Sequence, residues 1–196
     1  MCIICVSRPG VRQPGETLIR TMFLNNPHGA GYMFARGGRV QIHKGFMSLD
    51  DFLRAVRQEH FTATDSVVYH FRISTQAGVN PEMTHPFPLS NQPWRMRRLD
   101  QRCRIGVAHN GIIRLTSDPD NAQYSDTAIF ITDYLSQMVR GRADLRDQRV
   151  LDSVFQIAQS KFAIMDGGGY VATVGDFIDE RGLLFSNASY LPWRMR

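Results

Sequence analysis

A cysteine beside the first residue is the earliest position whose residue type could carry chemistry. Cys2 lies in the apolar run "MCIICVS", and Cys5 follows it at Cys-x-x-Cys spacing. If Met1 is removed, Cys2 gains a free α-amine, and an amine with a pKa of about 7.7–8.0 can take the thiol proton at neutral pH. The spacing also suits zinc or dithiol redox chemistry. A buried cysteine can equally pack as a small hydrophobe.

A shared metal is disfavoured if this run is a β-strand. Side chains alternate between the two faces of a strand, so Cys2 and Cys5 would point to opposite sides. The sequence has no second Cys-x-x-Cys and no clustered histidine pair to complete a tetrahedral site. We therefore expect no metal and no cofactor, and two interpretations of Cys2 stay open: packing, or a nucleophile with its own base.

Two polar segments downstream follow expected strands. "HFRISTQAG" puts Arg72 in or just past a strand end, followed by Ser74 and Thr75, and "VAHNGII" puts Asn110 and Gly111 directly after an apolar strand. Taken singly, the arginine could be a surface residue and Asn-Gly could be a hairpin turn. Neither motif alone decides for a function.

Together with Ser-Asp-Thr at 125–127, these motifs resemble the glutaminase domain of class II glutamine amidotransferases, which are N-terminal nucleophile (Ntn) hydrolases. The resemblance rests on the order and approximate spacing of Met-Cys, Gly-x-Gly in "HGAGYMF", Arg-x-Ser-Thr, "THPF", His-Asn-Gly and Ser-Asp-Thr. It extends from Cys2 to about Leu135, and the set is more specific than any of its members.

The resemblance implies a mechanism. Cys2 would attack the side-chain amide of glutamine and release ammonia and glutamate through a thioester. The Asn110 amide and the Gly111 N–H would form the oxyanion hole. Arg72 would bind the α-carboxylate, for which its planar fork is suited, and Asp126 would bind the α-ammonium group. Asp126 could also be a helix cap.

Further residues of the expected substrate site also come from the resemblance. Ser74 and Thr75 follow the arginine, and Gly29 would let the backbone approach the pocket closely. We expect His109 to support the oxyanion pair and His70 to be structural.

Three positions depart from the family pattern. Ile3 stands where glycine usually follows the nucleophile, His28 replaces an arginine before the Gly-x-Gly segment, and Gln76 replaces histidine or alanine. These departures leave open a second interpretation, an Ntn-type hydrolase that acts on a different amide.

Members of this family transfer ammonia to a synthetase or transferase domain. The residues that follow the glutaminase portion are too few to form such a domain. We therefore expect a separate synthetase or transferase partner. The resemblance is to small stand-alone forms from bacteria and phages, and it does not identify the ammonia acceptor.

Composition and pattern predict the fold class. The chain has 196 residues, 43% hydrophobic and 21% charged, which fits a single globular domain over 1–196. Strand-like and helical segments alternate in blocks, which favours an α+β domain. The resemblance sharpens this to an Ntn-like four-layer αββα sandwich with mostly antiparallel sheets.

Particular segments can be assigned. Gly37-Gly38 predicts a hairpin, Ser48 predicts the N-cap of a helix over 48–61, and Ser125 or Asp126 opens another over 125–140. No segment approaches the ~20 apolar residues of a membrane span, and an odd number of cysteines without an export signal predicts reduced thiols and a cytoplasmic location.

An Arg/Pro-rich segment over 84–104 is expected to be a loop insertion with short extended pieces. It concentrates Trp94 with several arginines in a chain of net charge +5. The arginines are Arg95, Arg97, Arg98, Arg102 and Arg104. Guanidinium groups beside an aromatic suit nucleic acid, so a scaffold that binds nucleic acid or a protein partner is a third interpretation. A solvated loop is the simpler one. "PWRMR" recurs at 192–196 without a physical explanation.

Overall fold

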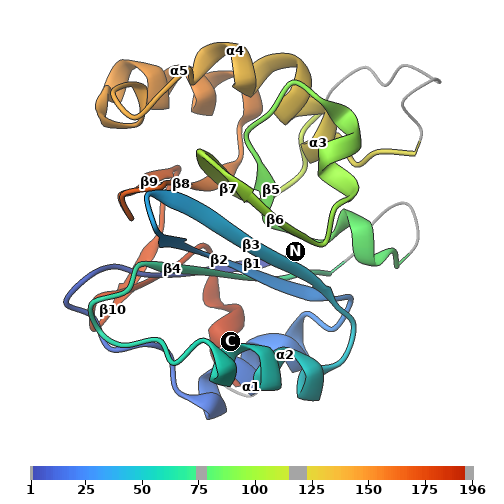
Figure 1. Ribbon diagram of the computed structural model, residues 1–196, viewed down its shortest axis with the longest axis vertical. Coiled ribbons are helices and arrows are strands. Elements are labelled where there is room, and N and C mark those ends of the chain that lie inside the picture. The colour runs from blue at the N-terminus through green and yellow to red at the C-terminus, as the bar shows by residue number, and fades with distance from the viewer. Residues whose placement is uncertain (1, 74–78, 115–122, 193–196) are drawn as a thin grey trace.

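Two antiparallel sheets face each other, with helices on their outer faces (Figure 1). The computed structural model describes residues 2–73, 79–114 and 123–192. The prediction of an α+β fold with antiparallel sheets is confirmed. Ser74, Thr75 and Gln76 lie outside the described residues.

The larger sheet has seven strands in the order β10-β11-β1-β4-β2-β3-β6. Their bounds are β1 Ile3–Ser7, β2 Ala30–Arg36, β3 Arg39–Phe46, β4 Val67–Phe71, β6 Asp100–Cys103, β10 Ile178–Glu180 and β11 Leu183–Phe185. The strand that follows Cys2 is therefore internal, between β4 and β11.

The smaller sheet has four strands in the order β5-β7-β8-β9. They are β5 Phe87–Pro88, β7 Ile105–Asn110, β8 Lys161–Asp166 and β9 Val171–Val174. The strand that ends at Asn110 is thus held between β5 and β8.

Helices cover the two outer surfaces. α1 Glu16–Asn25 and α2 Leu49–Gln58 lie against the seven-stranded sheet, whereas α3 Asp126–Phe130, α4 Ser136–Met138 and α5 Gln148–Ala158 lie on the four-stranded side (Figure 1). A π-helical turn, Ile131–Leu135, joins α3 to α4. Short 3-10 helices occur at Pro81–Met83, Pro93–Arg97, Asp144–Arg146 and Ala188–Tyr190.

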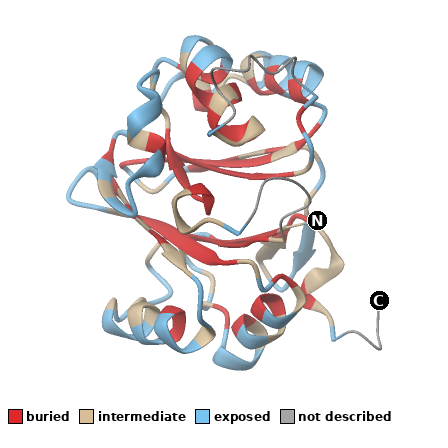
Figure 2. Ribbon diagram, turned by 90° about the vertical axis from the view of Figure 1, so that its right-hand side faces the viewer, coloured by how far each residue is buried: buried red, intermediate tan, exposed pale blue. Residues whose placement is uncertain are grey.

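Strand alternation divides the core into three layers. In β1, Ile3 and Cys5 face α1 and α2, while Ile4 and Val6 pack toward the four-stranded sheet. The third layer fills the space between β7, β8 and the upper helices. Figure 2 shows the buried residues along both sheets and exposed residues on the outer sides of the helices.

Local sequence signals account for several element ends. Gly37 and Gly38 both have positive φ, 60° and 72°, as a type I′ hairpin requires. The Ser48 side chain accepts a hydrogen bond from Asp51 N at 3.1 Å, and Ser125 accepts one from Ala128 N at 3.2 Å. The predicted N-caps are confirmed.

The Arg/Pro-rich segment is built into both sheets. Its first part contributes β5 to the smaller sheet, the "PWRMR" residues form a 3-10 helix, and its last part becomes β6, the edge strand beside β3. Within the described ranges, no helix has both the length and the apolar character needed to cross a membrane.

Candidate active site

Cys2 directly precedes β1, and its thiol lies against the end of β4. The sulfur accepts the Ile73 N–H at 3.4 Å and lies 3.6 Å from the Ile73 carbonyl oxygen, to which the thiol donates. Asn187 holds the backbone of Cys2 by donating from Nδ2 to its carbonyl at 2.7 Å. Burial raises the pKa of the Cys2 thiol, against the opposing effects of the Ile73 N–H and the Arg72 charge. The thiol is therefore protonated at neutral pH until a base acts on it.

Ile3 has no access to the site. Its side chain is fully buried in the layer beneath the seven-stranded sheet, and it pairs in register with Phe71. Because side chains alternate along a strand, the departure from the family pattern at this position changes core packing and not the space around the Cys2 thiol.

Arg72 follows β4 and is held by the segment that precedes β2. Its backbone N–H donates to Gly29 O at 2.8 Å, and its carbonyl accepts the His28 N–H at 2.9 Å. Burial lowers the pKa of the Arg72 guanidinium, while the charges of Cys2 and Asp126 raise it. The guanidinium therefore lies within electrostatic reach of both predicted site residues.

Gly29 has a backbone that only glycine adopts freely there. Its φ is +110°, and a Cβ at this position would lie 2.7 Å from Thr84 Cγ2. Gly29 is the backbone partner of Arg72, and a side chain at this position would press against Thr84 and Met47.

Asn110 ends β7 on the opposite sheet and is tied to the Cys2 strand through one serine. Its Nδ2 donates to Ser186 Oγ at 2.9 Å, and the same oxygen accepts the Ile4 N–H at 2.9 Å. Asparagine Nδ2 carries two N–H groups, and the bond to Ser186 uses one of them. Ser186 thus sets the separation between the amide of Asn110 and the beginning of β1.

Gly111 is fitted against Ser160. Its φ is +150°, and a Cβ would clash with Ser160 Oγ. Ser160 Oγ also lies 2.8 Å from His109 Nε2. Glycine is therefore required at 111 both by backbone conformation and by the side chain packed behind it.

Three buried histidines surround the turn that carries Asn110. His70 Nε2 donates to the His109 carbonyl at 3.0 Å, and His85 Nδ1 lies 3.0 Å from the same oxygen. His109 Nδ1 contacts Thr127 Oγ1 at 2.7 Å. Burial lowers the pKa of His70 to about 3, that of His109 to about 4, and that of His85 well below its usual value. They are therefore neutral at pH 7.

Asp126 begins α3 and points toward the same region. Its Oδ2 accepts the Ile113 N–H at 3.1 Å, and its Oδ1 accepts the Thr127 N–H at 2.7 Å. The carboxylate therefore fixes the chain beyond Gly111 to the start of the helix. Its charge also acts on both Arg72 and His109.

The structure thus gathers Cys2, Arg72, Asn110, Gly111 and Asp126 at one end of the two sheets, with Gly29 behind them. Ser186, Asn187 and Ser160 were missed by the sequence interpretation. Ser-Asn directly after an apolar strand was the only signal for the first two, and it names no partner.

Among the described residues, no group of three or more histidine, cysteine, aspartate or glutamate side chains could hold a metal ion. Cys5 is a fully buried free thiol in the lower core, apart from the Cys2 sulfur. A scan against protein-family models found no match, and a comparison with curated proteins found no significant relative.

Proposed function

We propose that this protein hydrolyses the side-chain amide of glutamine with Cys2 as its nucleophile, as a class II amidotransferase does. The observation that carries the proposal is the convergence of the Cys2 thiol, the Arg72 guanidinium and the Asn110 amide at one end of the facing sheets. A thiol, a fixed cation and an amide donor are the groups that this reaction needs.

The first step is deprotonation of the thiol. Because burial raises the Cys2 pKa, the sulfur needs a local base. The α-amine that removal of Met1 exposes lies on the same residue and takes this proton. His109 is not available for the task, because it is buried and bonded on both ring nitrogens.

The thiolate then attacks the amide carbon, and the carbonyl oxygen becomes an oxyanion. The second N–H of Asn110 Nδ2 and the Gly111 N–H stabilise this charge. The protonated α-amine of Cys2 then gives its proton to the leaving nitrogen. The tetrahedral intermediate expels ammonia, which leaves a thioester on Cys2. Water, deprotonated by the same amine, attacks the thioester and releases glutamate. The ammonia passes to a separate synthetase or transferase partner.

Charge pairing accounts for selection of a free amino acid. Glutamine carries one carboxylate and one ammonium group at its α-carbon. Arg72 would bind the first and Asp126 the second, and each already acts on the other electrostatically. A bound zwitterion would therefore neutralise both side chains at once.

The layer order also supports the assignment to Ntn hydrolases. Helices, a sheet, a second sheet and further helices follow one another with buried apolar layers between them. We propose that this is the four-layer αββα sandwich of that fold, in which the nucleophile begins an internal strand.

The decisive experiment compares Cys2→Ala with Cys103→Ala. Release of glutamate and ammonia from glutamine should disappear in the first and persist in the second, because Cys103 is a buried thiol on β6. Thermal unfolding of both variants controls for folding. Equal activity of Cys2→Ala and wild type overturns the proposal.

The intact mass of the active protein tests whether the α-amine of Cys2 is the base. Active protein should lack Met1, and a variant with Lys inserted after Met1, which retains methionine because the aminopeptidase removes it only before small residues, should be inactive. Full activity with Met1 in place would refute the α-amine mechanism while leaving the nucleophile standing.

A different amide as substrate is the remaining enzyme alternative. Ile3 gives it no support, because that side chain is buried in the core. His28 still motivates it, since its backbone is bonded to Arg72. Assays with glutamine, asparagine and N-acyl amides at equal concentration decide between them, and preference for an amide without an α-carboxylate would exclude the role proposed for Arg72.

A further inference from the structure

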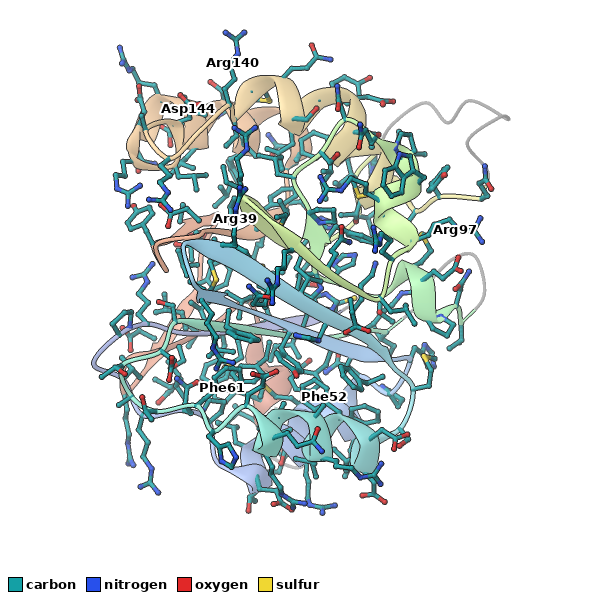
Figure 3. All side chains as sticks on the ribbon, viewed as in Figure 1. Arg39, Phe52, Phe61, Arg97, Arg140 and Asp144 are labelled. Carbon is teal, nitrogen blue, oxygen red and sulfur yellow. The ribbon has the colours of Figure 1, made fainter. Side chains whose placement is uncertain are left out.

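A polar groove of about 690 Å³ lies at the other end of the sheets, between the start of β3, the end of β6 and the end of α4. Five arginines line it: Arg39, Arg95, Arg102, Arg104 and Arg140. Figure 3 labels two of them, Arg39 at the start of β3 and Arg140 just beyond α4. No aspartate or glutamate is among its described lining residues.

The guanidinium groups of the groove have no carboxylate partner among the described residues. The ion pairs of the described chain involve other arginines, such as Arg36, Arg54 and Arg149. Arg95 donates to the Arg102 carbonyl at 3.2 Å, and Arg102 donates at 2.9 Å to Oε1 of Gln41, which lies in a neighbouring pocket that Arg102 also lines. These bonds orient the side chains without neutralising them.

Cys103 lies within electrostatic reach of two of these arginines, Arg95 and Arg39. It is 5% exposed at the end of β6 and lines the groove. Burial raises its pKa to about 12, although Arg95 and Arg39 act in the opposite direction. Arg95, from the 3-10 helix, and Arg39, from the start of β3, therefore both act electrostatically on one buried sulfur and line the same groove.

Positive side chains that line one groove repel one another unless an anion binds between them. The other lining residues are mostly neutral hydrogen-bonding groups, including Ser90, Gln92, Ser136 and Gln137. No aromatic side chain is among the described lining residues, so none of them offers a surface on which the bases of a single-stranded nucleic acid could stack. Its volume lies within the ~300–1,000 Å³ range of small-molecule sites.

We propose that this groove binds a small molecule carrying two or more phosphate groups, of the size of a nucleoside di- or triphosphate. The guanidinium groups bind the phosphates with paired N–H donors. The neutral amides and hydroxyls bind the uncharged part of the ligand.

This site is separate from the Cys2 site. β3 runs from Arg39 to Phe46, and Phe46 pairs with Ala30 at the Cys2 end. Seven steps along that strand span roughly 20 Å. The proposal therefore stands or falls independently of glutamine hydrolysis, and Cys2→Ala protein serves for its test.

The test is calorimetric titration with inorganic tripolyphosphate and with adenosine triphosphate at about 50 mM salt. The double variant Arg95→Gln/Arg104→Gln should bind both at least 10-fold more weakly. The matched control, Arg54→Gln/Arg149→Gln, removes the same charge from α2 and α5 and should bind as wild type does. Thermal unfolding confirms that both variants are folded.

Three results would overturn the proposal. The first is no binding of either probe by wild type, and the second is equal weakening in the control, which would mean a general charge effect. The third is a single-stranded oligonucleotide that binds more tightly than tripolyphosphate through Arg95 and Arg104, which would assign the groove to nucleic acid.

Discussion

The two ends of the facing sheets contrast in how their polar groups are satisfied. At the Cys2 end, Asn110, Ser186 and Asp126 are bonded to backbone or to one another. At the Arg39 end, the groove is lined by cations that meet no carboxylate among its described lining residues. The Cys2 end is held mainly by its own hydrogen bonds and leaves only a few buried atoms, such as Asn110 Oδ1 and His70 Nδ1, without a partner among the described residues. The other end gathers positive charge without a carboxylate to balance it.

This difference predicts opposite responses to substitution. Bonded, buried groups lose both function and stability when one partner is removed. Crowded like charges lose binding while stability holds or improves.

Asn110→Ala should lower kcat for glutamine hydrolysis by about 10²–10³-fold, because it removes one oxyanion donor. Steady-state kinetics measures this, with a much smaller change in KM. Asn25→Ala is the matched control, since Asn25 Nδ2 is likewise a hydrogen-bond donor within the protein, to the Ser189 and Leu191 carbonyls, and lies outside the candidate site. An unchanged kcat in Asn110→Ala would remove Asn110 from the oxyanion hole.

Arg72→Lys should raise KM for glutamine by about 10- to 100-fold, the equivalent of ~1.5–3 kcal/mol for a charge-assisted hydrogen bond. Lysine keeps the charge and loses the planar fork that matches a carboxylate. Arg36→Lys, at an exposed ion pair with Glu59, should leave KM unchanged. An Arg72→Lys enzyme with normal KM would show that another group binds the substrate carboxylate.

Ser186→Ala should lower the free energy of unfolding by about 1–3 kcal/mol, because Ile4 N and Asn110 Nδ2 both lose a buried acceptor. We also expect a fall in kcat smaller than that of Asn110→Ala. Urea denaturation with Ser153→Ala, an exposed helical serine, as control measures the first effect. Full stability of Ser186→Ala would contradict the view that this end is held by its own bonds.

Acidification should weaken the Cys2 end through its buried histidines. Their folded pKa values lie below the unfolded value of about 6.5, so the unfolded chain takes up protons first as pH falls. Stability is complete above about pH 6.5 and decreases toward pH 4, by up to ~1.4 kcal/mol per pH unit for each histidine. Urea denaturation between pH 7 and 5, where carboxylates stay mostly ionised, measures the slope. A slope of zero would show that these histidines are not buried and neutral.

Arg95→Gln/Arg104→Gln should leave the midpoint of thermal unfolding unchanged or slightly raised in low salt without phosphates. Removing two of several neighbouring positive charges relieves repulsion and breaks no ion pair of the described residues. A clear fall in the midpoint, absent from Arg54→Gln/Arg149→Gln, would mean that both ends of the sheets are held alike.

Local chemistry made much of the fold predictable. The double glycine at 37–38, the cap at Ser48 and the alternation in β1 depend on neighbouring residues only, and each is found as expected. The edge strand β6 lies in a segment expected to be mainly loop. Its residues Asp100–Cys103 are mostly polar and exposed, so their extended form depends on pairing with β3.

The residues of the candidate site could be predicted from the sequence. The residues that hold them in place could not. Cys2, Arg72 and Asn110 were named from motifs, and they lie at one end of the sheets. Ser186 and Asn187 act on residues more than 70 positions away, and no local pattern contains that pairing. The arginine groove likewise needed the fold, because Arg39 and Arg140 join the arginines of 84–104 only in space.

The position of β1 bears on how the protein is made. The first strand pairs with β11, and the Ile4 N–H bonds to a serine 182 residues later. A ribosome has therefore translated nearly all of the described chain before that strand gains its second neighbour. In the proposed mechanism, removal of Met1 can therefore precede completion of the sheet around Cys2. Fragments that stop before β11 lack both the strand that pairs with β1 and the serine that bonds Ile4.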